Sequence, residues 1–193
     1  MGPVARKHGT GALYAPGARR MKSGKFAAVA LVVMAWGGPA AAQSPQNIGV
    51  FKDWNAFASD ETDGKICFIA SQPTASKYSQ TVSGRDPAFF QITSIPTKTI
   101  HNEVSTIVGY TILTSADVTV DVDGTKFKMF LDASHPDTAW AVPDQEAALV
   151  EALKKGTKMT VVGTSSPRKT LVTDSYSLSG ISAALDKIAK ECP

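Results

Sequence analysis

Between residues 118 and 129 the chain carries two runs of alternating apolar and polar residues joined by Asp-Gly. Val118, Val120 and Val122 share one face of the first run, and Phe127 lies between two lysines in the second. Alternation at every second residue is typical of a half-buried strand, and Asp-Gly is a preferred two-residue hairpin turn. The segment therefore predicts an antiparallel hairpin in a chain that is mainly β.

Six further segments have the composition of strands. They are short, and turn residues such as Gly, Pro, Asp and Ser separate several of them. This arrangement is typical of a β-sandwich or a β-barrel. The predicted strands are Asp53–Ser59, Lys65–Ser71, Phe89–Ser94, Glu103–Tyr110, Lys158–Thr164 and Thr170–Leu178.

Two helices are predicted near the C-terminus. The first covers Asp144–Lys155, with acidic residues in its first turn, two lysines in its last and Gly156 directly after it. These charges complement the helix dipole, and Leu149, Val150 and Leu153 form its apolar stripe.

The second helix is expected from about Gly180 to Glu191, with Ser179 as its N-cap. Its apolar residues recur at intervals of three and four, which places them on one helical face together with the last cysteine. These residues are Ile181, Leu185, Ile188 and Cys192.

Cys67 and Cys192 are the only two cysteines of the chain. An even number of cysteines in an exported protein predicts a disulfide, which here would tie the terminal helix to the strand that carries Cys67. The alternative is a pair of buried free thiols.

The export prediction comes from residues 1–42. An apolar run, Phe26–Trp36, follows two lysines and precedes three alanines that end at Ala42. This is the pattern of a cleaved signal peptide, because eleven residues rise only about 16 Å as a helix and a membrane anchor needs about 20. We expect cleavage near Ala42, with Met21 as an alternative start. The mature part, residues 43–193, is expected to form a single β-rich domain without stable membrane insertion, located in the periplasm or secreted.

The formal net charge of +3 comes from the leader, which holds six basic residues and no acidic one. Without it, 14 basic residues face 17 acidic ones, a net charge of −3. A mildly acidic domain without a basic cluster lacks the electrostatic surface of a nucleic-acid-binding protein.

The densest polar cluster lies at residues 132–137. Asp132, His135 and Asp137 could form the centre of a small hydrolase or metal-dependent enzyme, but residues of these types beside a proline are commonly turn formers. No nucleotide-binding or nucleophile-elbow motif occurs. We therefore expect no catalytic, metal or cofactor-binding residues and no enzymatic activity, and keep the enzyme as the alternative.

Eight features in order along the chain carry a family resemblance. They are Trp54 before Cys67, Ala70–Pro73, Val104–Tyr110, the Asp123-Gly124 hairpin with Phe127, Asp137–Ala141, Gly163–Ser165, Tyr176–Leu185 and the final Cys192.

Through these features the chain resembles the invasion-associated locus B family of alphaproteobacterial exported proteins. The resemblance implies an immunoglobulin-like β-sandwich with an added helix. Together with the helices and cysteines described above, this predicts a β-sandwich with two added helices, the C-terminal one tethered by the disulfide. The resemblance also implies a non-enzymatic interaction protein, linked to host-cell invasion or to the envelope, whose partner is an unknown protein or envelope component. One departure is Ile181, where similar proteins tend to have phenylalanine.

Overall fold

The computed structural model describes residues 44–82 and 84–193. The predicted signal peptide, its cleavage near Ala42 and the alternative start at Met21 lie outside these residues. Within the described part, no helix is both long and apolar enough to cross a membrane.

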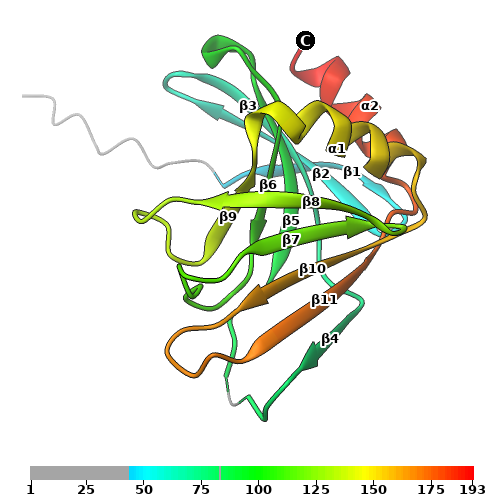
Figure 1. Cartoon of the computed structure of the whole chain (residues 1–193). Coiled ribbons are helices and arrows are strands. Elements are labelled where there is room, and N and C mark those ends of the chain that lie inside the picture. The colour runs from blue at the N-terminus through cyan, green and yellow to red at the C-terminus, as the bar shows by residue number, and fades with distance from the viewer. Residues whose placement is uncertain (1–43, 83) are drawn as a thin grey trace, which may run out of the picture. The chain divides into compact units, whose positions relative to one another are not determined.

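Eleven strands form one antiparallel sheet, with the two helices near one end of it (Figure 1). The order across the sheet is β1-β2-β3-β5-β6-β9-β8-β7-β10-β11-β4. The strands are β1 Gln46–Phe51, β2 Trp54–Glu61, β3 Gly64–Ser71, β4 Ala75–Tyr78, β5 Phe89–Ile95, β6 Ile100–Ile107, β7 Val118–Val122, β8 Thr125–Leu131, β9 Thr138–Ala141, β10 Lys158–Thr164 and β11 Leu171–Ser177; a 3₁₀ turn, η1, covers Pro96–Lys98.

The hairpin predicted from the alternating pattern is confirmed as β7 and β8. Val120 pairs with Phe127, and both side chains are buried. Asp123 and Gly124 form the turn with φ angles of 46° and 98°. Positive φ at both central residues matches the twist of the two strands, which explains why Asp-Gly is used here.

The sheet bends until distant strands face each other across one core. Trp54 on β2 donates a hydrogen bond from Nε1 to the carbonyl of Ser177 on β11, at 3.0 Å. The Phe90 ring of β5 contacts both the Trp54 ring and the Tyr176 ring edge to face. Because Trp54, Phe90 and Tyr176 are all buried, β2, β5 and β11 enclose the core in a sandwich-like arrangement. The mainly β fold with two helices is the predicted class.

Both predicted helices are present, as α1 Pro143–Lys155 and α2 Ile181–Glu191. The apolar stripes of both are buried as expected. The expected cap of α2 is wrong: the residue before the helix is Gly180, and no side chain caps it. Gly180 has a φ of 97°, and a Cβ there would lie 2.0 Å from the carbonyl oxygen of Phe51. The helix therefore starts where Gly180 lets the chain turn close to the end of β1, and a serine hydroxyl does not cap it.

A disulfide joins Cys67 on β3 to Cys192 at the end of α2, with the two Cα atoms 6.0 Å apart. Both cysteines are buried, and α2 packs over β1, β2 and β3. The bond therefore holds the C-terminal helix on the sheet, as the sequence predicts.

Candidate functional site

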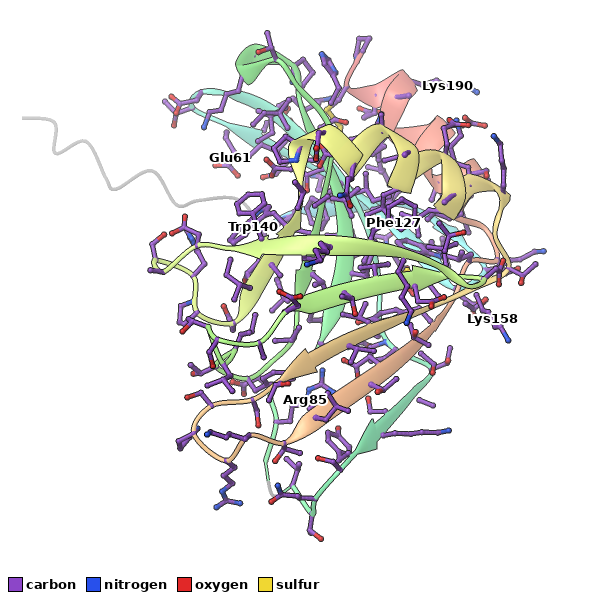
Figure 2. All side chains as sticks on the ribbon, in the orientation of Figure 1. Glu61, Arg85, Phe127, Trp140, Lys158 and Lys190 are labelled. Atoms are coloured by element: carbon purple, nitrogen blue, oxygen red, sulfur yellow. A yellow bond between two sulfur atoms is a disulfide. The ribbon has the colours of Figure 1, made fainter. Side chains whose placement is uncertain are left out.

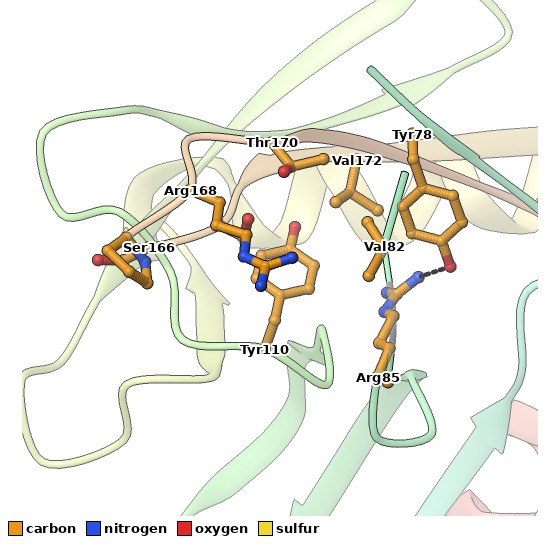
Figure 3. Close-up of a pocket in the computed structure, with 11 residues that line it drawn as sticks. Tyr78, Val82, Arg85, Tyr110, Ser166, Arg168, Thr170 and Val172 are labelled. Atoms are coloured by element: carbon orange, nitrogen blue, oxygen red, sulfur yellow. Dashed lines mark hydrogen bonds between the residues drawn. The ribbon is translucent and has the colours of Figure 1, made fainter. Parts of the chain in front are cut away.

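A pocket of about 270 Å³ lies beside the loop that joins β10 to β11 (Figure 3). We call it the arginine pocket. Residues from the segment after β4, from the stretch after β6 and from the β10–β11 loop contribute to it. Its lining residues are Tyr78, Val82, Gly84, Arg85, Tyr110, Ser165, Ser166, Pro167, Arg168, Thr170 and Val172.

Arg85 forms a nearly buried ion pair with Asp174 of β11. Nη1 of Arg85 lies 2.8 Å from Oδ1 of Asp174, and Nη2 lies 2.5 Å from Oδ2. The two side chains are only 10% and 2% exposed. Ser76 on β4 donates a further hydrogen bond to Oδ1 at 2.6 Å. This bidentate geometry fixes the guanidinium and compensates its charge, which is how proteins tolerate a buried arginine.

Arg85 also orders the groups around it. Nε donates to the carbonyl of Val108 at 2.8 Å, and Nη1 donates to the hydroxyl oxygen of Tyr78 at 3.3 Å. The guanidinium lies over the Tyr78 and Tyr110 rings, 5.9 and 5.3 Å from their centroids. Burial acts to lower the pKa of Arg85, but the hydrogen bonds to Asp174 and Tyr78 outweigh it and raise the pKa overall. Arg85 is therefore a permanently charged support for both tyrosines.

Tyr110 forms a half-buried wall of the pocket. Burial raises the pKa of its hydroxyl, which therefore stays protonated and able to donate a hydrogen bond. Its hydroxyl oxygen lies over Gly163 of β10, where a Cβ would approach it to 2.6 Å. The glycine in this strand thus makes room for the tyrosine.

Arg168 differs from Arg85 because its charge is not compensated. It is exposed, and among the described residues no acidic side chain lies within ion-pair distance of it. Its loop is held by backbone hydrogen bonds from Ser165 to Thr170 and from Lys169 to Ser165. This turn forms one side of the pocket.

The alternative enzyme site lies elsewhere, on the exposed loop between β8 and β9. Nδ1 of His135 is 3.8 Å from Oδ2 of Asp132, and these side chains are 61% and 52% exposed. Asp137 accepts a hydrogen bond from the hydroxyl of Thr138. The amide of Ser134 donates to Asp132 and lowers the pKa of that carboxyl. These hydrogen bonds are typical of a turn, and none of the three side chains lines the arginine pocket.

In the described part of the chain, no three His, Cys, Asp or Glu side chains are placed to hold a metal ion. The aromatic side chains fall into a buried group and a more exposed one. Trp54, Phe90 and Tyr176 are buried, whereas Phe130 is 44% exposed and stacks on Trp140, whose ring also contacts His135.

Sequence reasoning missed the Arg85–Asp174 pair and the two tyrosines of the pocket. Nothing in the sequence links Arg85 with Asp174, which are 89 positions apart. The sequence offers one signal. Asp174 lies in the alternating pattern of β11, on the same face as Val172 and Tyr176, which are buried.

The comparisons with known proteins agree with this fold. The crystal structure of invasion associated protein b from Bartonella henselae superposes with a TM-score of 0.51 at 17% sequence identity, covering 77% of this chain and 99% of that one. No curated protein matches the sequence. The family described as invasion associated locus B (IalB) protein matches over residues 54–189, which include most of the sheet and nearly all of α2. The chain belongs to the invasion-associated locus B family.

Proposed function

We propose that this protein acts outside the cytoplasm, in the periplasm or after secretion, as a non-enzymatic binding protein for a protein or another component of the cell envelope or host surface. The observation that carries the proposal is the buried Cys67–Cys192 disulfide. Such bonds persist in oxidising compartments and are rare in the cytosol. Family membership supports the same reading, because the family is one of exported proteins named for a role in invasion.

The geometry of the arginine pocket supports binding rather than catalysis. Its buried ion pair is fixed by several hydrogen bonds, and a nucleophile next to a general base is not among its lining residues. A catalytic site needs a nucleophile, base or metal with an open position near the reacting atom. A cavity with aromatic walls and one uncompensated cation instead suits recognition.

Export is tested by expressing the full chain in a bacterium and sequencing the amino terminus of the protein in each fraction. We expect periplasmic or secreted protein that begins at or near Gln43, with no thiol free under denaturing, unreduced conditions. Cytoplasmic protein with an intact leader and two free thiols would refute the proposal.

Binding is tested by immobilising the exported protein and exposing it to solubilised envelope extract, followed by mass spectrometry. A genuine partner should be displaced by soluble protein and should not bind the reduced, alkylated and unfolded chain. If no component is displaced in this way, or if hydrolysis of ester or phosphate substrates survives purification to homogeneity, the binding proposal fails.

A further inference from the structure

We propose that the arginine pocket binds a small carboxylate with an apolar or aromatic body, the size of one amino-acid residue. The source of this group is either a free acid or the C-terminal residue of a peptide. The inference deepens the proposed function and rests on it, since it assigns the chemistry of the ligand. The observations that carry it are the charge, the walls and the size of the cavity.

The charge of the cavity favours an anion. Arg85 and Arg168 line it, and no acidic residue does. Asp174 compensates the charge of Arg85 in their ion pair. Arg168 is therefore the cation at the pocket whose charge is not compensated. One free guanidinium matches the single charge and the two oxygens of a carboxylate, whereas a phosphate group carries nearly two charges.

The walls favour an apolar or planar body. Tyr78 and Val82 are 41% and 37% exposed, and both are among the few large apolar side chains that the described surface leaves open to this degree. Tyr110 and Val172 complete the apolar lining (Figure 3). Burying exposed apolar surface on these side chains would stabilise a bound ligand, and the tyrosine rings offer faces for stacking.

Two tyrosine hydroxyl groups beside Arg85 can donate hydrogen bonds to a ligand. Tyr78 accepts its hydrogen bond from Arg85, so its own O–H remains available to donate to a ligand. The protonated Tyr110 hydroxyl is a second donor. A volume of about 270 Å³ is just below the range of cavities that hold drug-sized molecules, which limits the ligand to about one residue.

The test measures binding of N-acetylphenylalanine to the disulfide-intact exported protein by two-dimensional NMR. We expect shifts of the amides of residues 165–170 and 109–111, with a dissociation constant on the order of 0.1–1 mM for a ligand of this size. N-acetylphenylalanine amide, which lacks the charge, and N-acetylglycine, which lacks the ring, should each bind at least about tenfold more weakly.

Two matched variants test the role of the cation. Arg168→Ala should weaken binding about 10- to 100-fold, as expected for loss of a charged hydrogen bond. Lys169→Asn is the control, because it removes the neighbouring charge while asparagine tolerates the positive φ of 56° at this position. The control should change the affinity less than about twofold, and the spectra of both variants away from the pocket should match the wild type.

A third comparison separates the two sources. If a pentapeptide ending in phenylalanine binds at least tenfold more tightly than phenylacetate, the ligand is a peptide C-terminus. If the two bind equally, the ligand is a free acid. Both results support the carboxylate site. The inference is overturned if no probe shifts the pocket amides at 10 mM, or if Arg168→Ala leaves the affinity unchanged. If these carboxylate probes fail in either way but an envelope partner is still captured by the wild-type protein, the proposed function stands and the pocket inference alone fails.

Discussion

The two ends of the described domain are held together by different chemistry. At one end the Cys67–Cys192 disulfide ties α2 to β3, and at the other the Arg85–Asp174 ion pair ties the segment after β4 to β11. Figure 2 labels Lys190 of α2 near the top of the view and Arg85 in its lower half. Each link joins segments that are distant in sequence, 125 positions apart for the cysteines and 89 for the ion pair.

The difference indicates which end of the domain is stabilised by a covalent link and which end carries the proposed binding pocket. A disulfide acts mainly by constraining the unfolded chain and leaves no charge at the surface. A buried ion pair contributes little net stability, because desolvation opposes the attraction between its charges. In this molecule the ion pair instead positions Tyr78 and Tyr110 beside a cavity, whereas the disulfide only secures a helix.

The largest effect is expected from breaking the ion pair on one side. Asp174→Asn keeps the shape but leaves Arg85 buried without a counter-charge, which should lower the free energy of unfolding by about 3–5 kcal/mol. Urea unfolding measures it. As a control, Arg85→Met combined with Asp174→Leu should cost less than the sum of the two single changes. Additive losses would show that the two side chains do not act as a pair.

Removing the disulfide should have the next largest effect. The Cys67→Ser, Cys192→Ser double variant avoids a free thiol and should lose about 2–5 kcal/mol of unfolding free energy. Guanidinium unfolding of the variant should agree with that of the reduced wild-type protein. A loss below about 1 kcal/mol would mean that burial of the apolar face of α2 holds the helix without the covalent link.

A smaller effect at the same end comes from the residue that starts α2. Gly180→Ala should lower the thermal stability because it adds a methyl group 2.0 Å from the Phe51 carbonyl oxygen at a positive φ. Gly124→Ala is a matched control, since its φ of 98° is nearly the same but no atom lies within 4 Å. The control should cost about 1 kcal/mol and Gly180→Ala clearly more. Equal losses would remove the proposed role of the close contact.

The smallest effect concerns the ion pair beside the disulfide. Nζ of Lys65 lies 2.8 Å from Oε1 of Glu191, and this hydrogen bond lowers the pKa of the Glu191 carboxyl. A lowered folded-state pKa gives stability that is present above the unfolded pKa of about 4.3 and is lost as the pH falls through the folded value. Lys65→Gln should reduce this acid dependence in the exchange of α2 amides.

Lys190→Gln serves as the control for that change, because Lys190 is exposed on the same helix and has no acidic side chain within ion-pair distance in the described structure. It should leave the pH dependence of α2 unaltered. The same acid response in both variants would assign it to the helix dipole or to other carboxyls.

Much of the fold could be predicted from local patterns. Period-two alternation identified β7 and β8, and apolar spacing of three and four identified both helices. Three strands, β1, β4 and β9, were missed because they are short or exposed and are ordered by their neighbours in the sheet. The disulfide could be predicted because only two cysteines exist, but local patterns cannot select one arginine and one aspartate among many charged residues.

The most direct test of the comparison is hydrogen exchange of the protein before and after reduction of the disulfide. If the two ends are held independently, reduction should speed exchange in Ile181–Glu191 while the amides of Val172 and Asp174, which pair with β10 or β4, stay slow. If protection falls at both ends together and to the same extent, the disulfide stabilises the whole sheet cooperatively. The division into one end stabilised by the disulfide and another that carries the arginine pocket is then wrong.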